Sequence, residues 1–181
     1  MRILLHACCG PCATYPFRAL REEGQAVEGY FYNPNIHPFA EWKRRREALE
    51  KLSAAAGFAV RFPPRYDPEA YFRAVSFHEE ERCPLCYRLR LAAVAREAKA
   101  SGFDAFTSTL LISVKQKHSL VRRIGEEVGR EAGIEFLYRD FRPGWKEHWR
   151  ITEEHGLYKQ QYCGCIYSEM ERYGDDKRGQ G

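Results

Sequence analysis

Short apolar runs alternate with helical patterns along most of this 181-residue chain, and no other feature constrains its fold as strongly. The spacing of apolar residues predicts strands at 2–6, 27–32, 58–62, 103–109 and 134–138. It predicts helices at 12–23, 39–56, 68–75, 88–100 and 116–132. Strands joined by helices form a parallel sheet with helices on both faces. We therefore expect an α/β fold whose ligands bind beyond the carboxyl ends of the strands.

The length and the less regular end of the chain predict one catalytic domain over residues 1–173. Residues 141–173 include a helix around Trp145 and Trp149, and we expect the rest of this cysteine-bearing extension to be irregular and to fold back over the sheet edge. The polar residues 174–181 are expected to form a disordered tail. No segment has the roughly 20 apolar residues of a membrane span, so a cytoplasmic location is expected.

Cysteine is the most informative residue type, because the seven cysteines fall into three tight groups. These groups are Cys8, Cys9 and Cys12, then Cys83 and Cys86, then Cys163 and Cys165. No secretory signal is evident, and a reducing compartment keeps ordinary thiols reduced. The grouping therefore favours metal or redox chemistry over a disulfide framework.

Cys83 and Cys86 form a Cys-x-x-Cys pair at the start of a helix, where backbone N–H groups favour thiolates. Cys8 and Cys9, at a strand end, add two sulfurs and complete the set that zinc or a [4Fe-4S] cluster requires. We expect adjacent cysteines to share one tetrahedral ion poorly, and surplus thiols are typical of electron-transfer sites. Both arguments favour iron-sulfur over zinc, although the residues alone leave the metal open.

The Cys163-Gly164-Cys165 turn has two interpretations. Gly164 gives the backbone the freedom to bring the two sulfurs together in a small, strained disulfide, which would be a redox couple for two electrons. Alternatively, both cysteines ligate metal.

Two further patterns point towards nucleic acid without requiring it. Hydroxyls from Thr107 to Ser113, with Lys115 beyond, suit a phosphate or sugar, or are ordinary turn residues. Aromatic and basic residues interleave at 42–46 and 138–150, as in RNA-binding surfaces, although core tryptophans and solvated arginines give the same pattern. The formal net charge of +4 permits a polyanionic partner. The chain has no phosphate-binding loop motif.

Five motifs taken together resemble the QueH family, the cobalamin-independent epoxyqueuosine reductases, over residues 2 to about 172. They are His6-x-Cys8-Cys9-x-Pro11, Tyr32-Asn33-Pro34-Asn35-Ile36, Arg82-Cys83-x-x-Cys86, Ser108-Thr109-Leu110-Leu111-x-Ser113 and Tyr158-x-Gln160-x-Tyr162-Cys163-Gly164-Cys165-x-x-Ser168. The resemblance implies a HUP-like (adenine nucleotide alpha hydrolase-like) fold. It also implies two-electron reduction of epoxyqueuosine to queuosine at the wobble position of tRNA, with a [4Fe-4S] cluster.

By this resemblance the cluster is carried onto Cys8, Cys9, Cys83 and Cys86, and a redox-active disulfide onto Cys163 and Cys165. Some family members have Asp at the position of Cys12, which is here a candidate ligand for an additional iron. The implied partners are tRNA carrying epoxyqueuosine and an unidentified electron donor.

Two other functions remain open at this point. One is an ATP-dependent tRNA-modifying enzyme of similar fold, which the missing phosphate loop disfavours. The other is a non-catalytic, zinc-stabilised RNA-binding module, which would leave Cys163 and Cys165 without a role.

Overall fold

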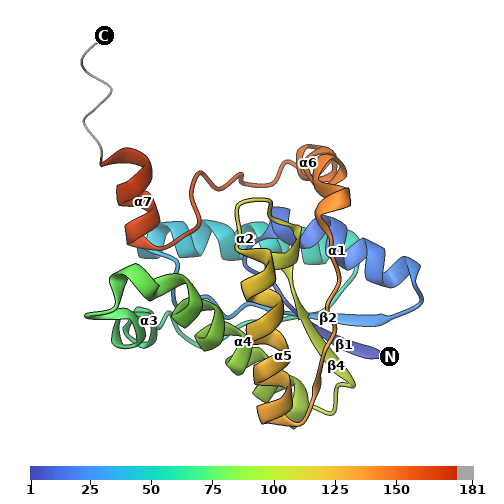
Figure 1. The fold of residues 1–181 in the computed structure, drawn as a ribbon. Coiled ribbons are helices and arrows are strands. Elements are labelled where there is room, and N and C mark those ends of the chain that lie inside the picture. Colours follow the sequence, from blue (N-terminus) through green and yellow to red (C-terminus); the bar gives the residue numbers. More distant parts are fainter. Residues whose placement is uncertain (175–181) are drawn as a thin grey trace.

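A five-stranded, all-parallel sheet forms the centre of the computed structural model, which describes residues 1–174 (Figure 1). The strand order is β3-β2-β1-β4-β5. The strands are β1 (Arg2–His6), β2 (Ala26–Tyr30), β3 (Val60–Arg61), β4 (Ala105–Ser108) and β5 (Glu135–Phe136). Because β1 has a partner on each side, its apolar residues after Arg2 are buried on both faces of the sheet.

Helices cover both faces of the sheet, as the crossover connections require. They are α1 (Gly10–Glu22), α2 (Phe39–Ala56), α3 (Pro68–Val75), α4 (Arg82–Ala100), α5 (His118–Ala132), α6 (Trp145–Glu154) and α7 (Ile166–Tyr173). Helices α4 and α5 pack side by side on one face, and α1 and α2 pack together on the other (Figure 1). The N-termini of α1 and α4 therefore both lie at the carboxyl edge of the sheet.

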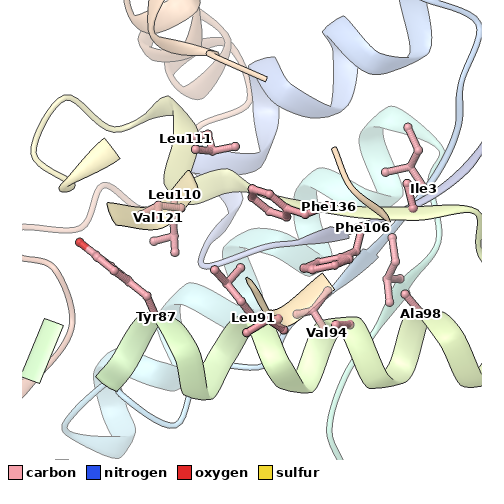
Figure 2. Close-up of a cluster of buried hydrophobic side chains, with 14 of the residues drawn as sticks. Ile3, Tyr87, Leu91, Val94, Ala98, Phe106, Leu110, Leu111, Val121 and Phe136 are labelled. Atoms are coloured by element: carbon pink, nitrogen blue, oxygen red, sulfur yellow. The ribbon is translucent and has the colours of Figure 1, made fainter. Parts of the chain in front are cut away.

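The larger core lies between the sheet and the α4–α5 face. Leu91, Val94 and Ala98 of α4 follow one another at helical spacing and point at the sheet, where Phe106 and Phe136 meet them (Figure 2). The rings of Phe106 and Phe136 are 5.1 Å apart. This packing holds α4 rigidly against β1 and β4, so that the first turns of α4 are fixed relative to the end of β1.

The α/β class and the parallel sheet are confirmed, and the differences from the expected elements are local. Helix α4 begins at Arg82, six residues before the expected start, because Pro84 lies in its first turn, where no backbone N–H is needed. Cys83 and Cys86 are therefore inside the helix. Helix α7 was not expected, since residues 166–173 give a single short amphipathic stretch. The expected tail falls on 175–181, outside the described residues.

No helix in the described chain is long and apolar enough to cross a bilayer.

Candidate metal and redox site

Cys8, Cys9 and Cys12 form a compact group of sulfurs between β1 and α1. Their Sγ atoms all lie within 4.8 Å of one another, and no other group of three or more possible metal ligands meets this limit in residues 1–174. The local fold makes this group, because Cys9 is the N-cap of α1 and its Sγ accepts the backbone N–H of Cys12 at 3.4 Å. The spacing of N-cap and N3 therefore places Cys12 beside the adjacent pair.

The Sγ atoms of Cys8 and Cys9 are 3.8 Å apart. Two thiolates on one tetrahedral ion, with metal–sulfur bonds of about 2.3 Å, are separated by about this distance. The expectation that two adjacent cysteines share an ion poorly is therefore wrong for this chain, and that argument no longer separates iron-sulfur from zinc.

Hydroxyls at the end of β4 support the loop that carries Cys8. Thr109 Oγ1 accepts the backbone N–H of Cys8 at 3.1 Å and donates to its Sγ at 3.3 Å. Ser108 Oγ lies 2.9 Å from His6 Nδ1 and accepts the N–H of Leu110. Both hydroxyls form hydrogen bonds within the protein, which fits the interpretation as turn residues and not as a phosphate site.

The three grouped thiols differ in acidity. Hydrogen bonds from the thiols of Cys12 and Cys9 hold the pKa of Cys8 well below its usual value. Burial raises the pKa of Cys9, and the bond to Cys8 raises that of Cys12. His6 beneath them is neutral at pH 7, because burial, and next Arg90, lower its pKa to about 4. Cys8 is therefore the thiol that loses its proton first.

Cys83 and Cys86 lie in the first two turns of α4, Cys83 half-buried and Cys86 buried. They lie outside the 4.8 Å group, and Cys86 packs instead in a small cluster with Tyr71, Val75 and Cys165. Burial raises the pKa of Cys86 to about 12. The structure thus brings the second cysteine group beside the third.

Cys163 and Cys165 are free thiols in this structure, as are the other five cysteines. Cys163 is exposed, and Gln116 Nε2 lies 3.6 Å from its Sγ. Cys165 is buried at the N-cap of α7. Gly164 between them has φ +129°, and a Cβ there would lie 3.1 Å from the side chain of Ile36, so both conformation and space call for glycine.

Arg90, one turn after Cys86 on α4, is only 1 % exposed. Its Nε and Nη2 are buried without a hydrogen-bond partner. Burial opposes its charge, but the nearby sulfurs of Cys86, Cys163 and Cys8 raise the pKa of Arg90. These three sulfurs belong to the three separate cysteine groups, so each group acts electrostatically on Arg90.

A second buried arginine, Arg45 on α2, holds the C-terminal extension in place. Its Nε donates to Glu41 at 2.7 Å, and its other nitrogens donate to the carbonyl oxygens of Tyr162 and Cys163, each at 2.9 Å. Tyr158 also donates to Glu41, at 2.6 Å. The extension is therefore fastened to α2 through a buried ion pair.

The stretch 42–46 was a candidate for RNA contact, and the structure corrects this for Arg45, which is buried and paired inside the protein. Lys43 and Arg44 are exposed, and Trp42 lines a cavity. The Glu41–Arg45 spacing of four residues was the sequence signal for the internal ion pair.

Gln160, to which the sequence assigned no role, contacts the cysteine group. Its Nε2 donates to Cys12 Sγ at 3.1 Å.

A cavity of about 380 Å³ opens near the carboxyl ends of β2 and β3. Tyr30, Tyr32, Trp42 and Phe62 form much of its wall. Asn33, also in the wall, donates to the carbonyl oxygen of Ala7 at 2.9 Å, so the cavity adjoins the loop that carries Cys8. An aromatic cavity of this kind suits a planar ring.

A parallel sheet of this strand order, with the Cys8, Cys9 and Cys12 group at the end of its central strand, defines an α/β protein with a cysteine group that could hold a metal. The sequence profile described as "Epoxyqueuosine reductase QueH" matches residues 3–171. The chain belongs to this family.

Individual relatives agree with the family match. The chain is 44% identical over 173 residues to "Epoxyqueuosine reductase QueH" of Dehalococcoides mccartyi, covering 96% of this chain and 95% of the relative. It is 32% identical over 179 residues to the protein of the same name from Thermotoga maritima, covering 94% and 91%.

Among solved structures, a "predicted subunit of tRNA methyltransferase" from Methanocaldococcus jannaschii superimposes with a TM-score of 0.59. The match covers 85% of this chain and 75% of the other at 13% identity, so it bears on the fold alone. The fold is the expected HUP-like α/β architecture.

Proposed function

We propose that this protein is an epoxyqueuosine reductase, which reduces the epoxide of epoxyqueuosine to give queuosine at the wobble position of tRNA. One observation carries the proposal: in a chain of this family, the sulfurs of Cys8, Cys9 and Cys12 lie within 4.8 Å of one another at the end of β1, where they could hold a metal. Removal of the epoxide oxygen consumes two electrons and two protons and releases water. Thiols and a thiolate-bound metal centre are the groups that deliver electrons in proteins.

The residues at this edge fit an iron-sulfur cofactor. The proposed cluster ligands are Cys8, Cys9, Cys83 and Cys86, and Cys12 is the proposed ligand of an additional iron. The unpartnered nitrogens of Arg90 suit an anionic assembly of thiolates beside them. Cys9 at the start of α1 and Cys83 at the start of α4 both lie at helix N-termini, whose macrodipoles favour a bound anionic group. When bound, the cluster supplies electrons one at a time.

Cys163 and Cys165 are proposed as a dithiol couple. Oxidation of the two thiols to a disulfide releases the two electrons and two protons that the epoxide consumes, so the reaction balances. The packing of Cys165 in one cluster with Cys86 supports a relay between the couple and the cluster. The exposed position of Cys163 leaves the couple open to re-reduction by an external electron donor.

The aromatic cavity beside the cysteine loop supports binding of an unpaired base. A base in the anticodon loop is unstacked easily, so the enzyme would need no duplex opening. Exposed Lys43 and Arg44, at the start of α2, are available for phosphate contacts. Because the substrate is tRNA, we propose the cytoplasm as the location.

One observation favours a second candidate, a zinc-stabilised RNA-binding module. The 3.8 Å separation of the Cys8 and Cys9 sulfurs fits a single tetrahedral ion. Such a module would need neither Cys163 nor a reductant.

Anaerobic purification and tRNA analysis test the proposed function together. The purified protein should be brown and contain iron and acid-labile sulfide, and it should convert epoxyqueuosine in tRNA to queuosine, followed by mass spectrometry. Colourless protein that contains only zinc would contradict the proposal and favour the RNA-binding module.

Variants separate ligands from the redox couple. Cys83→Ala should lose cluster and turnover together, whereas Cys163→Ala should lose turnover and keep the cluster. Loss of the cluster in Cys163→Ala would make Cys163 a ligand instead. Ser119→Ala, which removes one exposed side-chain group on α5, is the control and should retain both.

A further inference from the structure

We propose that Arg90 is the positioning residue that balances the charge of the cofactor and raises its reduction potential. This inference rests on the proposed function and goes beyond the ligand set, because Arg90 is neither a ligand nor a thiol. Its surroundings differ from those of every other buried charged side chain in the described chain, as the next observations show.

The guanidinium of Arg90 is buried without an anionic partner. It forms no salt bridge with a carboxylate in residues 1–174, and its Nε and Nη2 have no hydrogen-bond partner. The other buried charged side chains, Glu41 and Arg45, pair with each other. The ring of Tyr87, 6.0 Å from the guanidinium carbon, is a weak partner for a full charge.

Arginine cannot relieve this situation by losing its proton, because the guanidinium stays protonated in proteins. An unpaired buried charge costs several kcal/mol. A protein that keeps such a charge needs an anion next to it in its functional state. Cys83 and Cys86, which share a helix face with Arg90, are proposed cluster ligands, so the anion is the thiolate assembly that they help to form.

The geometry of α4 explains why Arg90 faces this assembly. Cys83, Cys86 and Arg90 follow at spacings of three and four residues, which puts them on one face of the helix. Packing of Leu91 and Val94 against the sheet fixes the rotation of the helix. A rigid element thus presents two proposed ligands and a fork of N–H donors to the same space.

A fixed positive charge stabilises the more negative member of a redox pair. Reduction adds an electron to the centre, so the guanidinium stabilises the reduced form more than the oxidised one. Hydrogen bonds from its free nitrogens to sulfur would act in the same direction. Without Arg90 the centre should therefore be harder to reduce.

The test is a redox titration of the anaerobically prepared holoprotein and three variants, monitored by absorbance and electron paramagnetic resonance. Arg90→Met removes the charge at similar length, Arg90→Lys keeps the charge but loses the fork, and Arg88→Gln removes an exposed charge from the same helix. Iron, sulfide and circular dichroism are measured for each protein.

For Arg90→Met we expect the equilibrium constant of one-electron reduction to fall at least tenfold, which is about 59 mV in midpoint potential. Arg90→Lys should fall between Arg90→Met and wild type, and Arg88→Gln should match wild type. Arg90→Met that holds full iron and sulfide at the wild-type potential would overturn the role of Arg90. If Arg90→Met does not fold, Arg90→Lys decides: a lowered potential supports the role, and an unchanged one overturns it.

The same measurement separates the two proposals. Wild-type protein that lacks iron and sulfide overturns the proposed function, and with it the inference that depends on it. An unchanged potential in a loaded Arg90 variant overturns only the role of Arg90.

Discussion

Arg45 and Arg90 are equally buried, yet their surroundings are opposite. Arg45, on α2, has a carboxylate and two carbonyl oxygens as acceptors. Arg90, on α4 across the sheet (Figure 1), has two buried nitrogens without any acceptor and no carboxylate partner in residues 1–174. The polypeptide itself supplies the acceptors of Arg45, and this pairing holds the C-terminal extension against α2. The surroundings of Arg90 are incomplete, so the missing partner, and not burial itself, marks the functional region.

The largest expected effect is a loss of stability when Arg45, the arginine with a full set of acceptors, is replaced. Arg45→Met leaves the Glu41 carboxylate buried without its partner, and the free energy of unfolding should fall by about 3–5 kcal/mol. Urea denaturation of wild type and Arg45→Met measures this change in the free energy of unfolding. Arg73→Met breaks an exposed pair with Glu69 and should cost less than about 1 kcal/mol. Equal losses of unfolding free energy in Arg45→Met and Arg73→Met would show that the buried Arg45 pair does not stabilise the attachment of the C-terminal extension.

A second prediction uses acid to weaken the same fastened region. His37 Nδ1 accepts the backbone N–H of Ile166 at 3.3 Å, and the His37 backbone N–H donates to Gly164 O at 2.8 Å. Burial lowers the pKa of His37 from 6.5 to about 4. Between these values the unfolded chain binds more protons, so His37 contributes its full stability above pH 6.5 and loses it progressively as pH falls towards 4.

From pH 7.5 to 5.0 this contribution should fall by about 2 kcal/mol. Urea denaturation at the two pH values, in wild type and His37→Gln, isolates it. The variant should have a shallower dependence on pH than wild type. Parallel slopes would mean that His37 titrates normally in the folded protein.

The smallest effect, and the one of opposite sign, is expected at Arg90. In metal-free protein Arg90→Met removes an unpaired charge, so the free energy of unfolding should stay unchanged or rise by about 1 kcal/mol. Denaturation with urea in the presence of a chelator gives this value. A loss as large as that of Arg45→Met would place Arg90 in the same structural class and remove the contrast between the two regions.

Patterns of local spacing predicted the scaffold well and the site less well. The bounds of α2 and α3 match the expected 39–56 and 68–75, because apolar periodicity and the Gly57 stop are local signals. Strand β1 matches the expected 2–6, whereas the other four strands are shorter than expected. At the two sheet edges, ladder pairing ends before the apolar runs do.

The site depends on contacts that sequence spacing does not encode. The compact group includes Cys12 because α1 begins at Gly10, two residues before its expected start. The position of Arg90 four residues after Cys86 was visible in the sequence. Its lack of a carboxylate partner depends on which segments meet across the sheet edge, which only the folded chain shows.

The unequal exposure of Cys163 and Cys165 has a consequence for the direction of electron flow. A thiol reductant in solution would meet the outer sulfur of Cys163 first, while the inner sulfur of Cys165 is shielded beside Cys86. A thiolate of the reductant would thus form a mixed disulfide at Cys163 and release the thiol of Cys165, and a second thiol of the reductant would then free Cys163 and leave as the reductant's own disulfide. The exposed sulfur of Cys163 would thus be the point at which the protein exchanges electrons with the reductant.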